Sequence, residues 1–147
     1  MATEIKACGV EIKNNEVLIC PLVKSGELFT VPDLRQQRLQ VNNADDQSQI
    51  QAFQRTFSKL MKDYGITQVA IRSRPQKGKF AGGAVGFKLE AAIQLIDGLT
   101  VTLLTNTQIN EQLKHTPLFI DFAETGLKKF LEPAFTTVFA ALSKKNG

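Results

Sequence analysis

The sequence contains no tryptophan, one tyrosine, one histidine and two cysteines among its 147 residues. The single histidine, His115, argues against a histidine-based triad or metal site. Cys8 and Cys20 lie in strand-like stretches without the CxxC or Cys/His spacing of a zinc site, so they are predicted to be buried free thiols. No run approaches the ~20 apolar residues of a membrane span, and the first residues hold no apolar signal core. We therefore expect a cytoplasmic protein that does not enter a membrane.

Composition and charge fit one soluble globular domain over residues 1–147. Apolar residues make up 43% of the chain and charged residues 22%, and this length is sufficient for a single core. The net charge of +4 permits a polyanionic partner. No acidic residue occurs between Asp63 and Glu90, whereas the basic residues of that segment are Arg72, Arg74, Lys77, Lys79 and Lys88. Because these cations follow a predicted strand, where open α/β sheets bind ligands, they form a candidate phosphate-binding surface.

Three glycines follow at positions where the apolar spacing is already helical. Gly82, Gly83 and Gly86 each cost about 1 kcal/mol relative to alanine inside a helix, so they need a reason. One interpretation is close packing, because Gly82 and Gly86 share one face of the helix. The other is phosphate binding by free backbone N–H groups at the helix start, beside Lys77 and Lys79. Both interpretations stay open, although the spacing is not that of a P-loop.

The N-terminal part of the chain predicts an antiparallel meander of three strands. Alternating apolar residues give strands at 5–12 and 17–23, joined by a turn at 14–15, where asparagine tolerates positive φ. Residues 28–31 are interpreted as a continuation of the second strand. Residues 38–41 are predicted to form the third strand, at an edge of the sheet, because polar residues interrupt it.

The rest of the chain alternates helices with apolar strands. A helix is expected to start at Asp46 or Ser48 and to end before Gly65. The remaining predicted elements are a buried strand at 66–71, a glycine-rich helix at 81–96, a buried strand at 99–104, a short helix capped by Thr105, Asn106 or Thr107 that runs to Leu113, and helices at 121–131 and 133–144. This order predicts an α/β protein with a mixed five-stranded sheet and helices on both faces.

The element order resembles the ribonuclease-H-like fold and, within it, the Holliday-junction resolvases. Cys8-Gly9-Val10-Glu11 at the end of the first strand resembles the GID motif of resolvases, with Glu11 in the position of their first catalytic aspartate. Glu132 falls near the last acidic cluster of that family. The stretch KGKFAGGAVGFKLEAAIQLI also resembles a small family of uncharacterised bacterial proteins.

The resemblance implies a metal-dependent nuclease, with Glu11 and Glu132 as its tentative catalytic residues and as tentative ligands of Mg²⁺ or Mn²⁺. Two-metal hydrolysis of a phosphodiester needs several converging carboxylates. The sequence departs from this pattern, because Ser73 stands where resolvases carry a glutamate and Phe135 stands where they carry another acid. Asp121 is a non-standard candidate for a third ligand.

The other interpretation of Glu11 is structural, since this carboxylate could equally form an ion pair with Arg72, Arg74 or Lys79. Glu90 lies on the glycine-rich helix, too far beyond the basic loop to be a good substitute for the missing acid.

We therefore predict a nucleic-acid-binding protein with weak or absent nuclease activity, and we leave catalysis itself open. The alternatives are a metal-dependent nuclease using Glu11 and Glu132, and a module that binds a small anion or another protein. The expected partner is DNA or RNA, and the resemblance to resolvases, which act as dimers, suggests a homodimer. The predicted nucleic-acid or phosphate contacts are Arg72, Arg74, Lys77, Lys79, Gly82, Gly83 and Lys88.

Overall fold

The computed structural model describes residues 4–75, 77, 82–118 and 122–143. Its centre is a hairpin of two long strands, β1 (Glu4–Lys13) and β2 (Glu16–Ser25), paired antiparallel along their whole length. Asn14 turns the chain between them with a φ of 54°, a left-handed conformation that asparagine tolerates better than most residues. The predicted first strands and their turn are thereby confirmed.

The sheet is mixed, as predicted, but it has six strands instead of five. The strand β5 (Gln68–Arg72) pairs parallel with β1, and β6 (Thr100–Leu104) pairs parallel with β5. On the other side, β3 (Leu28–Thr30) and β4 (Arg38–Gln40) both pair antiparallel with β2, so the order is β3-β2-β1-β5-β6 with β4 also on β2. Residues 28–30 therefore do not continue the second strand. Gly26, with a φ of 62°, reverses the chain before them.

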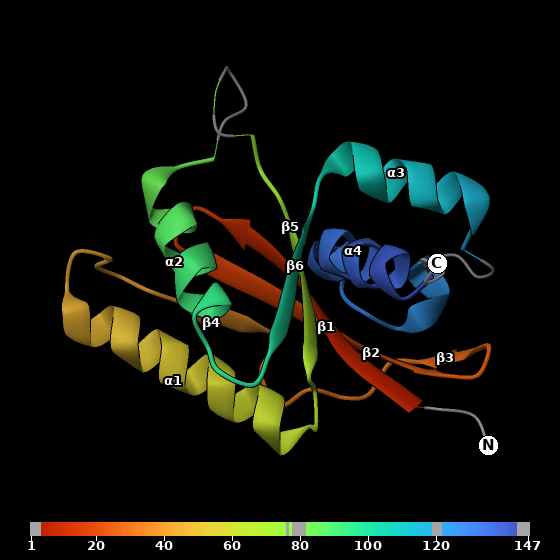
Figure 1. The fold of residues 1–147 in the computed structure, drawn as a ribbon, viewed down its shortest axis with the longest axis horizontal. Coiled ribbons are helices and arrows are strands. Elements are labelled where there is room, and N and C mark those ends of the chain that lie inside the picture. The colour runs from red at the N-terminus through yellow and green to blue at the C-terminus, as the bar shows by residue number, and fades with distance from the viewer. Residues whose placement is uncertain (1–3, 76, 78–81, 119–121, 144–147) are drawn as a thin grey trace.

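Helices cover both faces of the sheet, as Figure 1 shows. The helices α1 (Gln47–Asp63) and α2 (Ala84–Gln94) lie on one face, and α3 (Asn106–His115) and α4 (Glu132–Ser143) lie on the other. Alternate residues of β1 point to opposite faces of the sheet. Cys8, Val10 and Ile12 therefore pack in the core under α1 and α2, whereas Ala7 packs in the core under α4.

Local signals fixed several helix ends. Asp46 is the N-cap of α1 and accepts a hydrogen bond from the Ser48 backbone N–H, and Gly65 follows its C-cap with a φ of 69°. Thr105 caps α3 in a capping box with Gln108. The helix α2 begins at Ala84 with Gly83 as its N-cap, later than the predicted start at 81, which lies outside the described residues.

The prediction of an α-helix over 121–131 was wrong. The described part of that stretch forms two short 3₁₀ turns, Phe122–Thr125 and Lys129–Leu131, and α4 follows without a break at Glu132. Gly126, with a φ of 77°, separates the two turns. A left-handed residue at that point ends any continuous right-handed helix.

Burial agrees with the predicted state of the cysteines. Cys8 and Cys20 are free and buried, and burial raises the pKa of the Cys20 thiol to about 12 and that of the Cys8 thiol further. Both are thus inert thiols at neutral pH. None of the described helices is long and apolar enough to cross a membrane.

Candidate functional site

Glu11 and Arg72 come together at the carboxyl ends of two parallel strands. Val10 of β1 pairs with Ile71 of β5, so the next residue of each strand occupies adjacent positions in the sheet. Alternation directs both side chains to the face that α4 covers, since Val10 and Ile71 point into the opposite core. The strand β6 ends at the same edge, immediately before the N-cap of α3. We call this edge the carboxyl edge.

Arg72 joins three elements at the carboxyl edge. Its Nε donates to the Thr137 Oγ1 at 3.1 Å, its Nη2 donates to the Thr136 Oγ1 at 2.8 Å, and its Nη1 donates to the Asn106 Oδ1 at 2.7 Å. Both threonine hydroxyls in turn donate to the Pro133 carbonyl within the first turn of α4. The guanidinium therefore ties β5 to the starts of α3 and α4, and these contacts use donors that a ligand would otherwise take.

The carboxylate of Glu11 is half-buried, and burial raises its pKa. Lys13 and Arg72 oppose this shift through their positive charges. Burial likewise lowers the pKa of Arg72, and the Glu11 charge opposes that change. Arg72 and Arg74 are the described cations among the three predicted structural partners of Glu11, and of these two Arg72 has the charge interaction with Glu11. No direct ion pair joins the described side chains of Glu11 and Arg72.

The carboxylates that the structure describes at the carboxyl edge do not by themselves form a site for Mg²⁺ or Mn²⁺. Glu132 is the first residue of α4, and its Oε1 lies 3.4 Å from the Nζ of Lys129. Asp121, the predicted third ligand, lies outside the described residues. Across the part of the chain that the structure describes, no three histidine, cysteine, aspartate or glutamate residues gather as a metal-binding group. Hard divalent cations need several oxygen ligands, and the positive charge of the guanidinium beside Glu11 opposes the binding of a cation there.

The glycine-rich stretch surrounds the side chain of Arg74. Its guanidinium lies over the Phe87 ring, 4.8 Å from the centroid. A Cβ atom at Gly82 or at Gly86 would lie 2.7 Å from the Arg74 Cζ, closer than real Cβ contacts allow. Gly82 and Gly86 thus allow close packing, but what packs against them is the Arg74 guanidinium and not the sheet.

Glu90 is a buried carboxylate beside Arg74, a position that the sequence analysis did not predict. Its side chain is only 8% exposed, its Oε2 has no hydrogen-bond partner among the described residues, and burial raises its pKa against the opposing charge of Arg74. Arg74 in turn has two buried nitrogens, Nε and Nη2, without described partners. The signal in the sequence is the spacing of Gly86 and Glu90 within α2, because residues four apart share one face of a helix.

The other predicted phosphate contacts are spread around the carboxyl edge. Gly83 is the exposed N-cap of α2, without a side-chain cap, and a Cβ placed there would meet no atom of the described residues within 4 Å. Lys77 is exposed. The Nζ of Lys88 binds the Asp45 Oδ1 at 2.9 Å and the Ala44 carbonyl at 3.2 Å, which ties α2 to the loop before α1. Lys79 lies outside the described residues.

Comparisons with known proteins agree with this architecture. A family model described as "Protein of unknown function (DUF3010)" matches residues 5–141. No curated protein matches the sequence. Among solved structures, RuvC of Thermus thermophilus has a TM-score of 0.71 at 11% identity, covering 95% of this chain and 94% of RuvC. The same protein in complex with a Holliday junction substrate has a TM-score of 0.68 at 10% identity, covering 95% and 93%. At such low identity the likeness concerns the fold, and it confirms the predicted ribonuclease-H-like architecture.

Proposed function

We propose that this chain, which belongs to the DUF3010 family of proteins of unknown function, is a nucleic-acid-binding protein of ribonuclease-H-like fold with weak or absent nuclease activity. The observation that carries the proposal is the arginine beside Glu11. At the end of β5, next to the one carboxylate of β1 at this edge, stands Arg72, hydrogen-bonded to Asn106, Thr136 and Thr137. Its N–H donors stay with these internal acceptors, but its positive charge favours phosphate at this edge and repels a divalent metal ion.

The binding surface in this proposal is the rim of the carboxyl edge. Lys77 supplies an exposed ammonium group, and Lys88 adds a positive charge whose Nζ is shared with Asp45. The start of α2 at Gly83 supplies backbone N–H groups with the positive end of the helix dipole. Arg72 and Arg74 position this rim through their internal contacts. That RuvC is solved with a Holliday junction supports the view that a fold of this shape accommodates DNA.

The test is a binding and cleavage panel on single strands, duplexes and branched DNA, and on RNA, with and without Mn²⁺. The proposal expects binding without Mn²⁺ and a logarithm of the affinity that falls linearly with the logarithm of the salt concentration, because phosphate contacts release counterions. The variant Lys77→Glu with Lys88→Glu should weaken binding to all sequences alike. A matched charge reversal, Lys114→Glu with Lys128→Glu, changes two other exposed lysines and should have a smaller effect.

Two results would decide against the proposal. Absence of binding to every nucleic acid in the panel removes it, and so does binding that salt leaves unchanged. Efficient Mn²⁺-dependent cleavage that Glu11→Gln abolishes would instead establish the metal-dependent nuclease. The DNA or RNA preference and the homodimer remain predictions, and the same panel with sedimentation of the free protein checks them.

A further inference from the structure

The largest hollow described on the surface lies at the opposite edge of the sheet from the carboxyl edge. It is a groove of about 580 Å³ between α1 and the turn from α2 to β6. Because α1 leads into β5 and α2 leads into β6, the ends of both helices lie at the amino ends of these parallel strands (Figure 1). The residues of the groove that matter below are Arg55, Lys59, Lys62, Asp63, Leu95 and Asp97.

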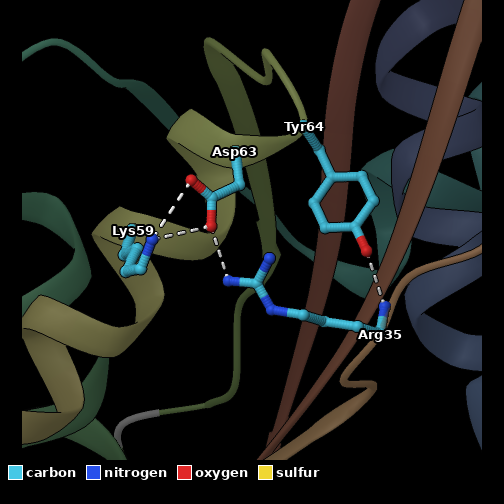
Figure 2. A network of polar contacts seen from close by, with 4 residues as sticks. All are labelled: Arg35, Lys59, Asp63 and Tyr64. Carbon is cyan, nitrogen blue, oxygen red and sulfur yellow. Dashed lines mark hydrogen bonds and ion pairs between the residues drawn. The ribbon is translucent and has the colours of Figure 1, made fainter.

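The walls of the groove are held in place by contacts within the chain. Gln54 on α1 donates from its Nε2 to the Ala92 carbonyl on α2 at 2.9 Å, which fixes the spacing of the two helices. At one end, the Asp63 carboxylate binds Arg35 at 2.7 Å and Lys59 at 3.1 Å, as Figure 2 shows. The groove is therefore preformed, which lowers the entropy cost of binding a partner.

The rim of the groove is cationic on the side of α1. Arg55, Lys59 and Lys62 lie at helical spacing on one exposed face. The Asp63 charge is already shared between Arg35 and Lys59. Among the described residues, neither Arg55 nor Lys62 has an ion pair or hydrogen bond that would occupy its charge.

The opposite wall presents a large apolar side chain. Leu95, the C-cap of α2, is 74% exposed, the most of the large apolar residues in the described chain. Interfaces between proteins commonly surround an apolar contact with a polar and charged rim. An exposed leucine across from a row of cations, two of which have no ion pair among the described residues, therefore has the composition of a small docking surface.

We propose that this groove docks an acidic segment of a partner protein, with its carboxylates on Arg55, Lys59 and Lys62 and an apolar side chain against Leu95. Nucleic acid fits the groove less well for two reasons. None of the lining residues that the structure describes has an aromatic ring on which a base could stack, and the carboxylates of Asp63 and Asp97 in the wall would repel a continuous phosphate backbone. A peptide can space its charges to avoid these two aspartates.

The experiment is a titration of the isotope-labelled full chain with a short peptide of glutamate and leucine residues, followed by the shifts of backbone amide signals. Signals of Arg55, Lys62 and Leu95 are expected to move, and those at the carboxyl edge are expected to stay. Arg55→Glu with Lys62→Glu should weaken binding at least tenfold. Leu95→Ser should weaken it about tenfold, the equivalent of burying one aliphatic side chain. All three positions are exposed, so the variants retain the fold.

Matched controls separate this docking from general attraction of charge. The variant Lys114→Glu with Lys128→Glu has the same net charge as the double reversal and should bind the peptide with less than a threefold change. A peptide with serine in place of leucine should bind about tenfold more weakly than the original. Absence of shifts in the groove overturns the proposal, as does equal loss in the control variant. Displacement of the peptide by single-stranded DNA at the groove would also overturn it, in favour of a nucleic-acid surface there.

Discussion

Gly9→Ala is the substitution that tests most directly how the carboxyl edge is built. Gly9 lies on β1 where the first turn of α4 crosses the sheet. A Cβ atom at this position would overlap the Ala134 carbonyl oxygen and would lie 2.9 Å from the Val138 Cβ and 3.0 Å from the Ala134 carbonyl carbon. These neighbours belong to the backbone and core of α4, so no flexible side chain can move aside.

The magnitude follows from the displacement that the methyl group imposes. Ordinary contacts begin at 3.4 Å, so the Val138 contact alone requires α4 to move by about 3.4 − 2.9 = 0.5 Å, and the Ala134 carbonyl requires more. Overpacking of this kind costs about 1–3 kcal/mol. The same movement stretches the hydrogen bonds of Arg72 to Thr136 and Thr137, each worth about 1 kcal/mol. We therefore expect Gly9→Ala to lower the free energy of unfolding by about 3–5 kcal/mol.

The assay is urea unfolding followed by circular dichroism at the helical band, with Gly83→Ala as the matched control. A Cβ atom at Gly83 meets no atom of the described part of the chain within 4 Å, so that variant should change the free energy of unfolding by less than about 1 kcal/mol. Equal losses in the two variants, or a loss below about 1 kcal/mol for Gly9→Ala, would refute the reasoning that α4 is packed directly on the β1 backbone.

Three further predictions concern the arginines and the buried carboxylate. Arg72→Ala should cost about 2–4 kcal/mol in urea unfolding because three hydrogen bonds are lost, whereas Arg35→Ala, which breaks an exposed ion pair, should cost less than about 1 kcal/mol; equal costs would contradict the assignment. The change that Gly86→Ala makes in the free energy of unfolding should be more favourable by at least about 1 kcal/mol in an Arg74→Ala background than in the natural chain, because the guanidinium no longer occupies the space. A double-mutant cycle with no coupling would contradict the packing of the Arg74 guanidinium against Gly86. Burial raises the pKa of Glu90, so the folded state binds its proton more tightly than the unfolded chain, and stability is lost as pH rises from about 4.3 through the folded pKa. Glu90→Gln should therefore be more stable than the natural chain at pH 7, with a difference that shrinks toward pH 4; a constant difference would exclude this linkage.

Much of the fold could be predicted because its signals are local. The alternation in β1 and β2, the cap at Asp46 and the glycine after α1 each act within a few residues, and the structure confirms the strands and helix ends that they predict. The prediction failed at residues 28–30, where the same apolar composition suits a continuing strand or a new one. Which of these forms depends on the reversal at Gly26 and on pairing with β2.

The candidate site divides in the same way between sequence and structure. The sequence located the cations and Glu11 near strand ends, since position along the chain and strand order determine that much. It could not assign their partners. Arg72 bonds to Thr137, which is 65 residues away, and Arg74 is enclosed by glycines whose purpose appears only when α2 folds back onto it.

The sequence by itself determined the strand and helix order, the buried thiols and the accumulation of positive charge after β5, because these follow from periodicity and composition. Only the tertiary structure decided that two of the arginines are committed to internal contacts and that Glu90 is buried beside one of them. The physical reason is that hydrogen bonds and desolvation depend on the three-dimensional neighbours of a group, and those neighbours come from distant parts of the chain.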